Sequence, residues 1–426
     1  MALRIIATRA TPALFTLPWT TPLESWDDMF VVPLQRGLSR HVVQIVRLGS
    51  DVYAVKETRE HLAFREYRML RDLRRLGLPT VEPVAVVVGR EEPDGQPLEP
   101  ALVTAHLRYS LPYRSLFSHG LRADTLPRLL DALAVLLVRL HLNGFFWGDV
   151  SLSNVLFRRS AGEFAAYLVD AETGELHPEL SPGQQRHDLD IAYTNLFGEL
   201  LDLQAGSILD ESVDPFAIVD RVKERYESLW AELTRTEEFT TDEMWKIEQR
   251  IETLNELGFD VDELDIVTDL DGSTVRIQPK VVEAGHHSRE LQSLTGLDVE
   301  DNQARRLLND IASFTAHFDL GGEDRWIVAN RWLNTVYEPT IAMVPPHLRG
   351  RLEAAEIFHE ILVHRWYLSE NAGHEVDTKV AARSYIDTVL SKRPEEAVAA
   401  AGEDPDLLLP PAQDTDEIAA IGDELL

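Results

Sequence analysis

Short runs of Val and Ile, separated by turn residues, dominate the first quarter of the chain. Such runs between Gly, Ser, Asp and Pro are typical of β-strands joined by short loops. The pattern predicts five strands, at residues 30–34, 41–48, 52–56, 81–89 and 100–107. One helix interrupts the series at residues 60–76, because its apolar residues recur at helical spacing and Gly77 and Pro79 follow it.

Apolar positions later recur mostly every three or four residues, which is the period of an amphipathic helix. Residues 213–255 are also charged and amphipathic, and we read them as helical. The predicted helices span residues 126–140, 184–203, 303–318, 326–336, 348–369 and 376–390. Two short apolar runs, 155–157 and 166–169, flank a polar break and predict a β-hairpin. Two further strands are expected around Asp271-Gly272.

The composition is that of a globular protein of two or three domains, with 426 residues and 44% hydrophobic residues. There is no cysteine, which excludes disulfides, thiolate nucleophiles and cysteine-based metal sites. The longest apolar run, 132–138, is far shorter than a bilayer span. We therefore expect no membrane span and a cytoplasmic location.

The negative charge is concentrated in the later part of the chain. Residues 1–150 carry 18 Lys and Arg against 16 Asp and Glu, a net charge of +2. Because the whole chain has a net charge of −31, residues 151–426 have a net charge of −33. Nucleic acids need cationic neutralisation, which argues against a nucleic-acid partner. A nucleotide in a local pocket remains compatible with this charge, and the acidic, Trp-containing later region suits a protein partner.

Two carboxylates and an amide gather around the predicted hairpin. Asp149 and Asn154 lie five residues apart in the loop that enters its first strand, and Asp170 directly follows its second strand. A hairpin would hold the three side chains at one end. Carboxylate and amide oxygens are the ligands that Mg²⁺ prefers, so the pattern predicts a site for a hard cation.

This order of residues resembles the protein-kinase-like superfamily. Asp149 and Asn154 resemble its catalytic loop and Asp170 its metal-binding aspartate, while Lys56 and Glu66 resemble its nucleotide-binding lysine and the partner of that lysine. Trp147-Gly148-Asp149 and Asp170-Ala171-Glu172 are most similar to the small-molecule and lipopolysaccharide kinase (Kdo/WaaP) branch. The whole chain resembles a bacterial family that is labelled as a domain of unknown function, DUF4032.

The resemblance implies an α+β, two-lobed protein-kinase-like fold with an added, mainly α-helical C-terminal domain. It implies ATP and Mg²⁺ as cofactors, with Asp149 as the base, Lys56 on the phosphates, Glu66 orienting Lys56, and Asn154 and Asp170 on the metal. Gly37 and Ser39 stand where kinases place a phosphate loop, but a plain hairpin turn is an equally good reading. The expected parts are a 1–30 extension, a 31–107 N-lobe, a 108–212 C-lobe core, a 213–390 helical domain and a 391–426 disordered tail.

The expected activity is ATP-dependent phosphotransfer to a hydroxyl group of a small molecule or glycan. Trp147 in place of the usual His, and the glycine-poor phosphate loop, leave two alternatives open: a nucleotide-binding pseudokinase scaffold that recruits a protein partner, or nucleotidyl transfer. His141 is interpreted as a structural hydrogen-bonding residue. The pair His286-His287 is interpreted as structural too, because adjacent histidines diverge on regular structure and no third ligand is close in the sequence.

Overall fold

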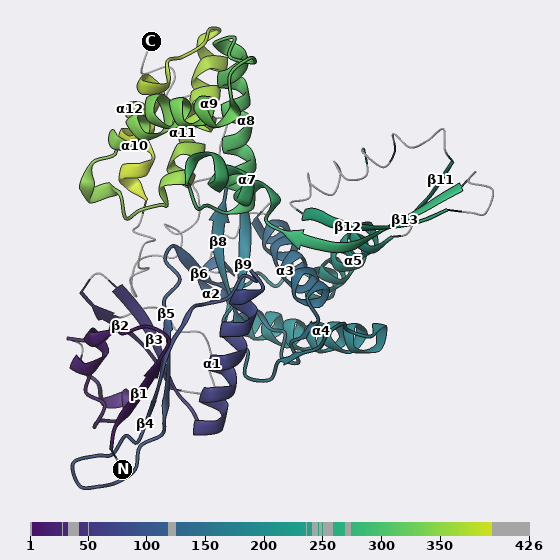
Figure 1. Cartoon of the computed structure of the whole chain (residues 1–426). Coiled ribbons are helices and arrows are strands. Elements are labelled where there is room, and N and C mark those ends of the chain that lie inside the picture. The colour runs from purple at the N-terminus through teal and green to yellow at the C-terminus, as the bar shows by residue number, and fades with distance from the viewer. Residues whose placement is uncertain are drawn as a thin grey trace. The chain divides into compact units, whose positions relative to one another are not determined.

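The computed structural model describes residues 2–27, 29–32, 42–49, 51–117, 125–235, 237–240, 246, 249, 259–268 and 274–393. Its described residues form two compact units. Unit 1 contains residues up to 158 and residues 166–223, whereas unit 2 contains residues 159–165 and 224–393. Unit 1 combines sheets with helices and unit 2 is mostly helical, which confirms the predicted α+β class (Figure 1).

A five-stranded antiparallel sheet forms the first part of unit 1, in the order β1-β4-β5-β3-β2. The strands are β1 (Arg4–Ala7), β2 (Val43–Leu48), β3 (Asp51–Glu57), β4 (Pro83–Val88) and β5 (Ala101–Ala105). The last four agree with predicted strands. The predicted strand at 30–34 is described up to residue 32, where Val32 donates its backbone N–H to Ile45.

The residues before the sheet cover one of its faces and also add strand β1 to its edge. Leu14, Trp19, Leu23 and Trp26 are buried with Val55 and other residues of that face. Burial of such aromatic and aliphatic side chains is the main source of stability in a small lobe. The N-terminal segment is therefore an integral part of this sheet's core.

Helix α1 (Glu60–Arg75) covers the other face of the sheet (Figure 1). Its apolar side chains recur every three or four residues, so Ala63 and Tyr67 pack on Val86 and Leu102. The same buried face carries one acidic residue, Glu66, which is only 2% exposed. Lys56 and Leu102 are register partners in the sheet, so Lys56 shares the α1-facing side with Leu102.

The second part of unit 1 is organised by two long helices, α3 (Thr125–Leu142) and α4 (Pro182–Ala205). Both agree with predicted helices. Between them lie β7 (Phe145–Phe146), the 3-10 turn Leu152–Asn154, β8 (Val155–Ser160), β9 (Glu163–Leu168) and β10 (Glu175–Leu176). The strand β6 (Ser110–Pro112) precedes the short helix α2 (Tyr113–Phe117) and pairs with β8, and β8 and β9 form the predicted hairpin.

Unit 2 contains a three-stranded sheet and a group of helices. Helix α5 (Pro215–Thr234) leads into it, followed by β11 (Glu237–Thr240), β12 (Phe259–Thr268) and β13 (Thr274–Ala284) in the order β11-β13-β12. The continuous helical reading of residues 213–255 is wrong at β11, because pairing with β13 overrides the local helical pattern. The helices are α7 (His286–Thr295), α8 (Asp301–His317), α9 (Arg325–Trp332), α10 (Glu338–Ala342), α11 (Ala354–Ala372) and α12 (Thr378–Thr388).

The turn of the β8–β9 hairpin, with Ala161 buried and Gly162 exposed, is bound by two helices of unit 2. Ala161 and Gly162 both have positive φ angles, 52° and 83°, as a tight two-residue hairpin turn requires. The carboxylate of Glu356 on α11 accepts hydrogen bonds from Ala161 N (2.8 Å) and Gly162 N (3.4 Å). Gln303 Nε2 on α8 donates to the same carboxylate (3.0 Å) and to the carbonyl of Arg159 (3.3 Å). Helices α8 and α11 thus both contribute a polar side chain that holds this turn.

Some predictions lie outside the described residues. They concern Gly37 and Ser39, the turn at Asp271-Gly272, and the tail after residue 393. Within the described residues, no helix combines the length and apolar character that a membrane crossing requires.

Candidate functional site

Lys56 lies at the centre of the candidate site, surrounded by three carboxylates. Its Nζ donates to Glu66 Oε2 at 3.0 Å, to Asp170 Oδ2 at 2.6 Å and to Glu172 Oε2 at 3.2 Å. The Lys56 side chain is 12% exposed and that of Glu66 2%, so water screens this ion pair weakly. Strand β3, helix α1 and the loop after β9 thus bring together residues that are up to 116 positions apart in the chain.

The charges of this cluster are unbalanced. Burial by itself lowers the pKa of Lys56, but the carboxylates of Glu66 and Asp170 outweigh burial and raise it above its ordinary value. Burial, aided by the negative charge of Asp170, raises the pKa of Glu66 to about 8 even though Lys56 opposes the shift. One ammonium facing three carboxylates favours the uptake of a proton or a cation.

The backbone around Asp170 is held by its neighbours. The residue before Asp170 is Val169, whose backbone N–H donates to the carbonyl of Asn154 at 3.0 Å. This bond joins the open ends of the two hairpin strands. The indole of the fully buried Trp147 donates to the carbonyl of Asp170 at 3.0 Å. Glu172 N donates to Asp170 Oδ1 at 2.9 Å. The second oxygen of Asp170 therefore points to Lys56 while the first closes a local turn.

Asp149 and Asn154 contact each other within the loop that leads into β8. Asn154 Nδ2 donates to the backbone carbonyl of Asp149 at 3.0 Å and to its Oδ2 at 3.2 Å. The orientation of the Asn154 amide follows from these bonds. The predicted convergence of Asn154 and Asp170 at one end of the hairpin agrees with the Val169–Asn154 backbone bond.

The loop carrying Asp149 is braced by a buried carboxylate on α4. Asp188 accepts from Trp147 N at 2.7 Å and Gly148 N at 2.8 Å, and it contacts His141 Nε2 at 3.1 Å. His141 therefore has the structural role that the sequence indicated, and the carboxylate of Asp188 holds the backbone of the loop. Gly144 begins this segment with φ +73°, and a Cβ there would lie 2.0 Å from the carbonyl oxygen of His177. Only glycine fits that turn.

Three contacts of the site were not predicted from the sequence. Asn195 and Glu199 on α4 bind the loop between Asp149 and Asn154, and Arg65 on α1 donates to the carbonyl of Gly174 at 3.1 Å. A signal for the first two was present in the chain, because polar residues at 188, 195 and 199 share one face of a helix. Nothing in the sequence pairs that face with the loop.

The oxygens around Asp170 suit a hard divalent cation. Carboxylate oxygens of Glu66, Asp170 and Glu172 lie within 4.8 Å of one another, and when all three are ionised their combined charge exceeds that of Lys56 by two. Mg²⁺ prefers one or two carboxylates plus phosphate and water, a set that Asp170 and Asn154 fit as donors.

The histidine pair at the start of α7 has a third group nearby, which corrects the expectation from the sequence. The ligand atoms of His286, His287 and Glu290 lie within 4.8 Å of one another. Glu290 also forms an ion pair with Arg325 on α9. Because that guanidinium already neutralises the carboxylate, the cluster is balanced within the protein.

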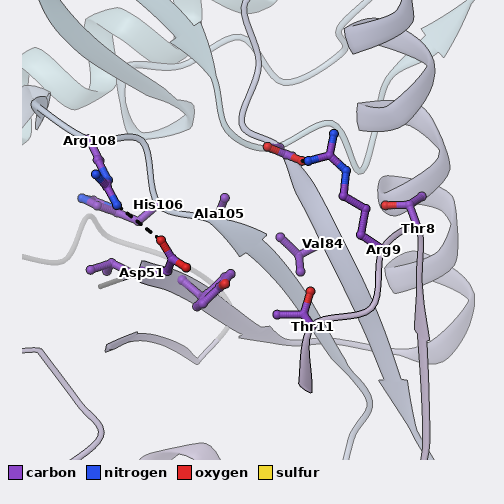
Figure 2. A pocket seen from close by; sticks show the side chains of 11 residues that line it. Thr8, Arg9, Thr11, Asp51, Val84, Ala105, His106 and Arg108 are labelled. Carbon is purple, nitrogen blue, oxygen red and sulfur yellow. Dashed lines mark hydrogen bonds and ion pairs between the residues drawn. The ribbon is translucent and has the colours of Figure 1, made fainter. Parts of the chain in front are cut away.

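A pocket of about 300 Å³ is lined by residues that follow β1, by residues of β3 and β4, and by residues at the end of β5 (Figure 2). Tyr53 lines it, and Tyr53 and Lys56 are three residues apart on β3, so their side chains point to opposite faces. Arg108 faces Asp51 at 3.3 Å and Arg9 faces Glu82 at 3.9 Å. Burial lowers the pKa of His106 in this pocket to about 4. The pocket is therefore separate from the Lys56 cluster, and each of these arginines faces a carboxylate.

Comparisons with known proteins identify two regions of the chain. Residues 40–196 match the family model described as the lipopolysaccharide kinase (Kdo/WaaP) family. Residues 228–390 match DUF4032, a domain of unknown function. A solved structure described as "WaaP in complex with acyl carrier protein" is 18% identical, with a TM-score of 0.32, over 54% of this chain and 100% of that chain. A search of curated proteins found no match.

Proposed function

Because the chain joins a region of the lipopolysaccharide kinase (Kdo/WaaP) family to a DUF4032 region, and its fold is kinase-like, we propose that it transfers a phosphoryl group from ATP to a hydroxyl group. The observation that carries the proposal is the Lys56–Glu66 pair at 3.0 Å, with Asp170 on the same ammonium at 2.6 Å. A competent kinase-like site needs both this ion pair and the metal-binding aspartate in place. The Lys56–Glu66 pair is formed, and we assign the role of the metal-binding aspartate to Asp170.

Each predicted site residue then has a specific role. Lys56 binds the phosphates of the nucleotide and Glu66 keeps its ammonium in position. Asp149 accepts the proton of the acceptor hydroxyl, and Asn154 and Asp170 hold Mg²⁺. Gly37 and Ser39 lie outside the described residues, and their contact with the phosphates stays a prediction from the sequence. When bound, Mg²⁺ would neutralise the charge that develops on the phosphates, and it would balance the carboxylate excess around Lys56.

The acceptor we propose is a small molecule or a glycan. The support is the family match of residues 40–196 and the Asp170-Ala171-Glu172 sequence, which is similar to that branch of the superfamily. For the helical region, we propose a second role in binding a protein partner. Its support is the negative charge that gathers in the later part of the chain.

The test separates nucleotide binding from turnover through Asp149. Asp149→Asn keeps the shape of the side chain but removes the base, so ATP affinity should stay within a few-fold while turnover falls by about 10²- to 10⁴-fold. Lys56→Met should instead weaken ATP binding itself. Asp51→Asn, on an exposed carboxylate of the same strand as Lys56, serves as the control.

Binding is measured by calorimetry with ATP and Mg²⁺ or with a chelator, and turnover by ATP consumption. The intact mass of any modified product distinguishes phosphoryl from nucleotidyl transfer. If ATP binds equally well without Mg²⁺, the metal roles of Asn154 and Asp170 are wrong. If ATP binds but wild type and Asp149→Asn behave alike in turnover and in complementing a deletion strain, the protein is a nucleotide-binding scaffold.

A further inference from the structure

One face of helix α4 carries three polar side chains that all hydrogen-bond to the loop between β7 and β8. At about 100° per residue, the steps of seven and four residues between Asp188, Asn195 and Glu199 keep the three within about 20° of one line along the helix. Asp188 holds the start of the loop, as described above. Asn195 and Glu199 contact the residues that follow, in the same order along the chain.

Asn195 contacts the residue proposed as the base. Its Nδ2 donates to Asp149 Oδ1 at 3.3 Å and to the carbonyl of Val150 at 3.1 Å. The other carboxylate oxygen of Asp149 accepts from Asn154 at 3.2 Å. Each oxygen of Asp149 therefore meets one neutral amide donor, and the two donors come from different elements. Such donors restrict the orientation of a carboxylate without adding a charge that would pair with it.

Glu199 holds the backbone between Asp149 and Asn154. Its two carboxylate oxygens accept from Leu152 N at 2.6 Å and Ser153 N at 2.9 Å. These amides begin the turn Leu152–Asn154, and the side chain of Ser151 at the capping position contacts Ser153 Oγ (3.1 Å) instead of capping the turn. A carboxylate from another helix thus takes the place of a local cap, with two charge-assisted bonds. The turn ends at Asn154, so its position depends on Glu199.

We propose that Asn195 and Glu199 are positioning residues of the phosphoryl-transfer site, with Asn195 orienting Asp149 and Glu199 holding the turn that presents Asn154. The inference rests on the proposed function. Both residues act through the loop, so their loss should affect turnover far more than nucleotide affinity. A displacement of about 1 Å in a reacting group lowers a rate by about 10²-fold.

The test uses the full-length protein with ATP and Mg²⁺ as the probe. Glu199→Gln replaces one acceptor oxygen by an N–H donor that faces Leu152 N or Ser153 N, and Asn195→Asp places a second carboxylate beside Asp149. Hydrogen exchange of the segment 149–155 should become at least tenfold faster in Glu199→Gln. For both variants the turnover number should fall by about 10²-fold, with the KM for ATP within about threefold. Asp202→Asn, exposed on the same helix, is the matched control.

A double variant separates positioning from general stability. Asp149→Asn with Asn195→Asp restores an amide–carboxylate pair but moves the charge to α4, so exchange of the loop should be slower than in Asn195→Asp, whose two carboxylates repel each other, while turnover stays lost. If exchange in Glu199→Gln equals wild type, or if exchange rises while turnover is unchanged, the positioning role is wrong. If wild type itself shows no turnover, the proposed function fails. The exchange rates of Glu199→Gln then decide separately whether Glu199 holds the loop.

Discussion

The buried carboxylate of Glu356 offers the sharpest test of how unit 2 is held together. Glu356 is 3% exposed and accepts hydrogen bonds from Ala161 N, Gly162 N and Gln303 Nε2. Replacing it with alanine leaves Ala161 N buried without an acceptor, which costs about 1–3 kcal/mol. Gly162 N loses a longer bond, and Gln303 keeps the carbonyl of Arg159 as a second acceptor. The expected loss is therefore about 2–4 kcal/mol of unfolding free energy for Glu356→Ala.

In a unit of this size that loss lowers the melting temperature by roughly 6–12 °C. The measurement is thermal and urea unfolding of the full-length protein, with hydrogen exchange at residues 159–163 to locate the effect. Glu356→Gln keeps one acceptor and should lie between wild type and Glu356→Ala. Glu370→Ala, exposed on the same helix, is the control and should change stability by less than about 0.5 kcal/mol. Equal stability of Glu356→Ala and Glu370→Ala, with unchanged exchange at the turn, would refute the reasoning.

Three further predictions concern unit 1. His106 has a folded pKa of about 4 against about 6.5 when unfolded, so the unfolded chain binds more protons in this range and wild type loses up to about 3 kcal/mol as pH falls from 6.5 to 4. His106→Gln should flatten that part of the stability curve measured by urea unfolding, and parallel curves would contradict it. The buried Arg90 binds Glu57 at 2.7 Å, so Arg90→Met should cost about 3–5 kcal/mol in the same assay, whereas the exposed Arg75→Met should cost almost nothing. Trp147→Phe removes the donor to the carbonyl of Asp170, and we expect about 1–3 kcal/mol lower stability and weaker Mg²⁺ dependence of ATP binding, against no change for the exposed Trp366→Phe.

Long amphipathic segments could be predicted from the sequence because each buries one face, and the apolar residues of that face recur at a regular local spacing. Helices α1, α3 and α4 and strands β2 to β5 agree with the predicted segments for this reason. The prediction fails at β11, where a short segment of a helical-looking region pairs with β13. Strand pairing is a long-range interaction that local periodicity does not encode.

The linear order of the site was also contained in the chain. Asp149, Asn154 and Asp170 flank a hairpin, so their spacing suggested one cluster, and the resemblance to the protein-kinase-like superfamily added Lys56 and Glu66. The tertiary structure adds Glu172 as a third acceptor for Lys56, although Glu172 lies only two residues beyond Asp170. The direction of the Glu172 side chain depends on the local turn in which Glu172 N donates to Asp170 Oδ1.

Other contacts were decided by tertiary structure alone. In the sequence, Asn195 and Glu199 are ordinary polar positions of a helix. Their role follows only from the contact of α4 with a loop that lies some 45 residues earlier in the chain. In the sequence, Glu356 is a charge on an apolar helix. Only the structure shows that its donors come from the turn at Ala161, 195 residues away in the chain. Local periodicity determines which face of an element is buried. Which backbone donors that face meets depends on how distant elements pack, because a buried carboxylate is stable only where such donors are already fixed in place.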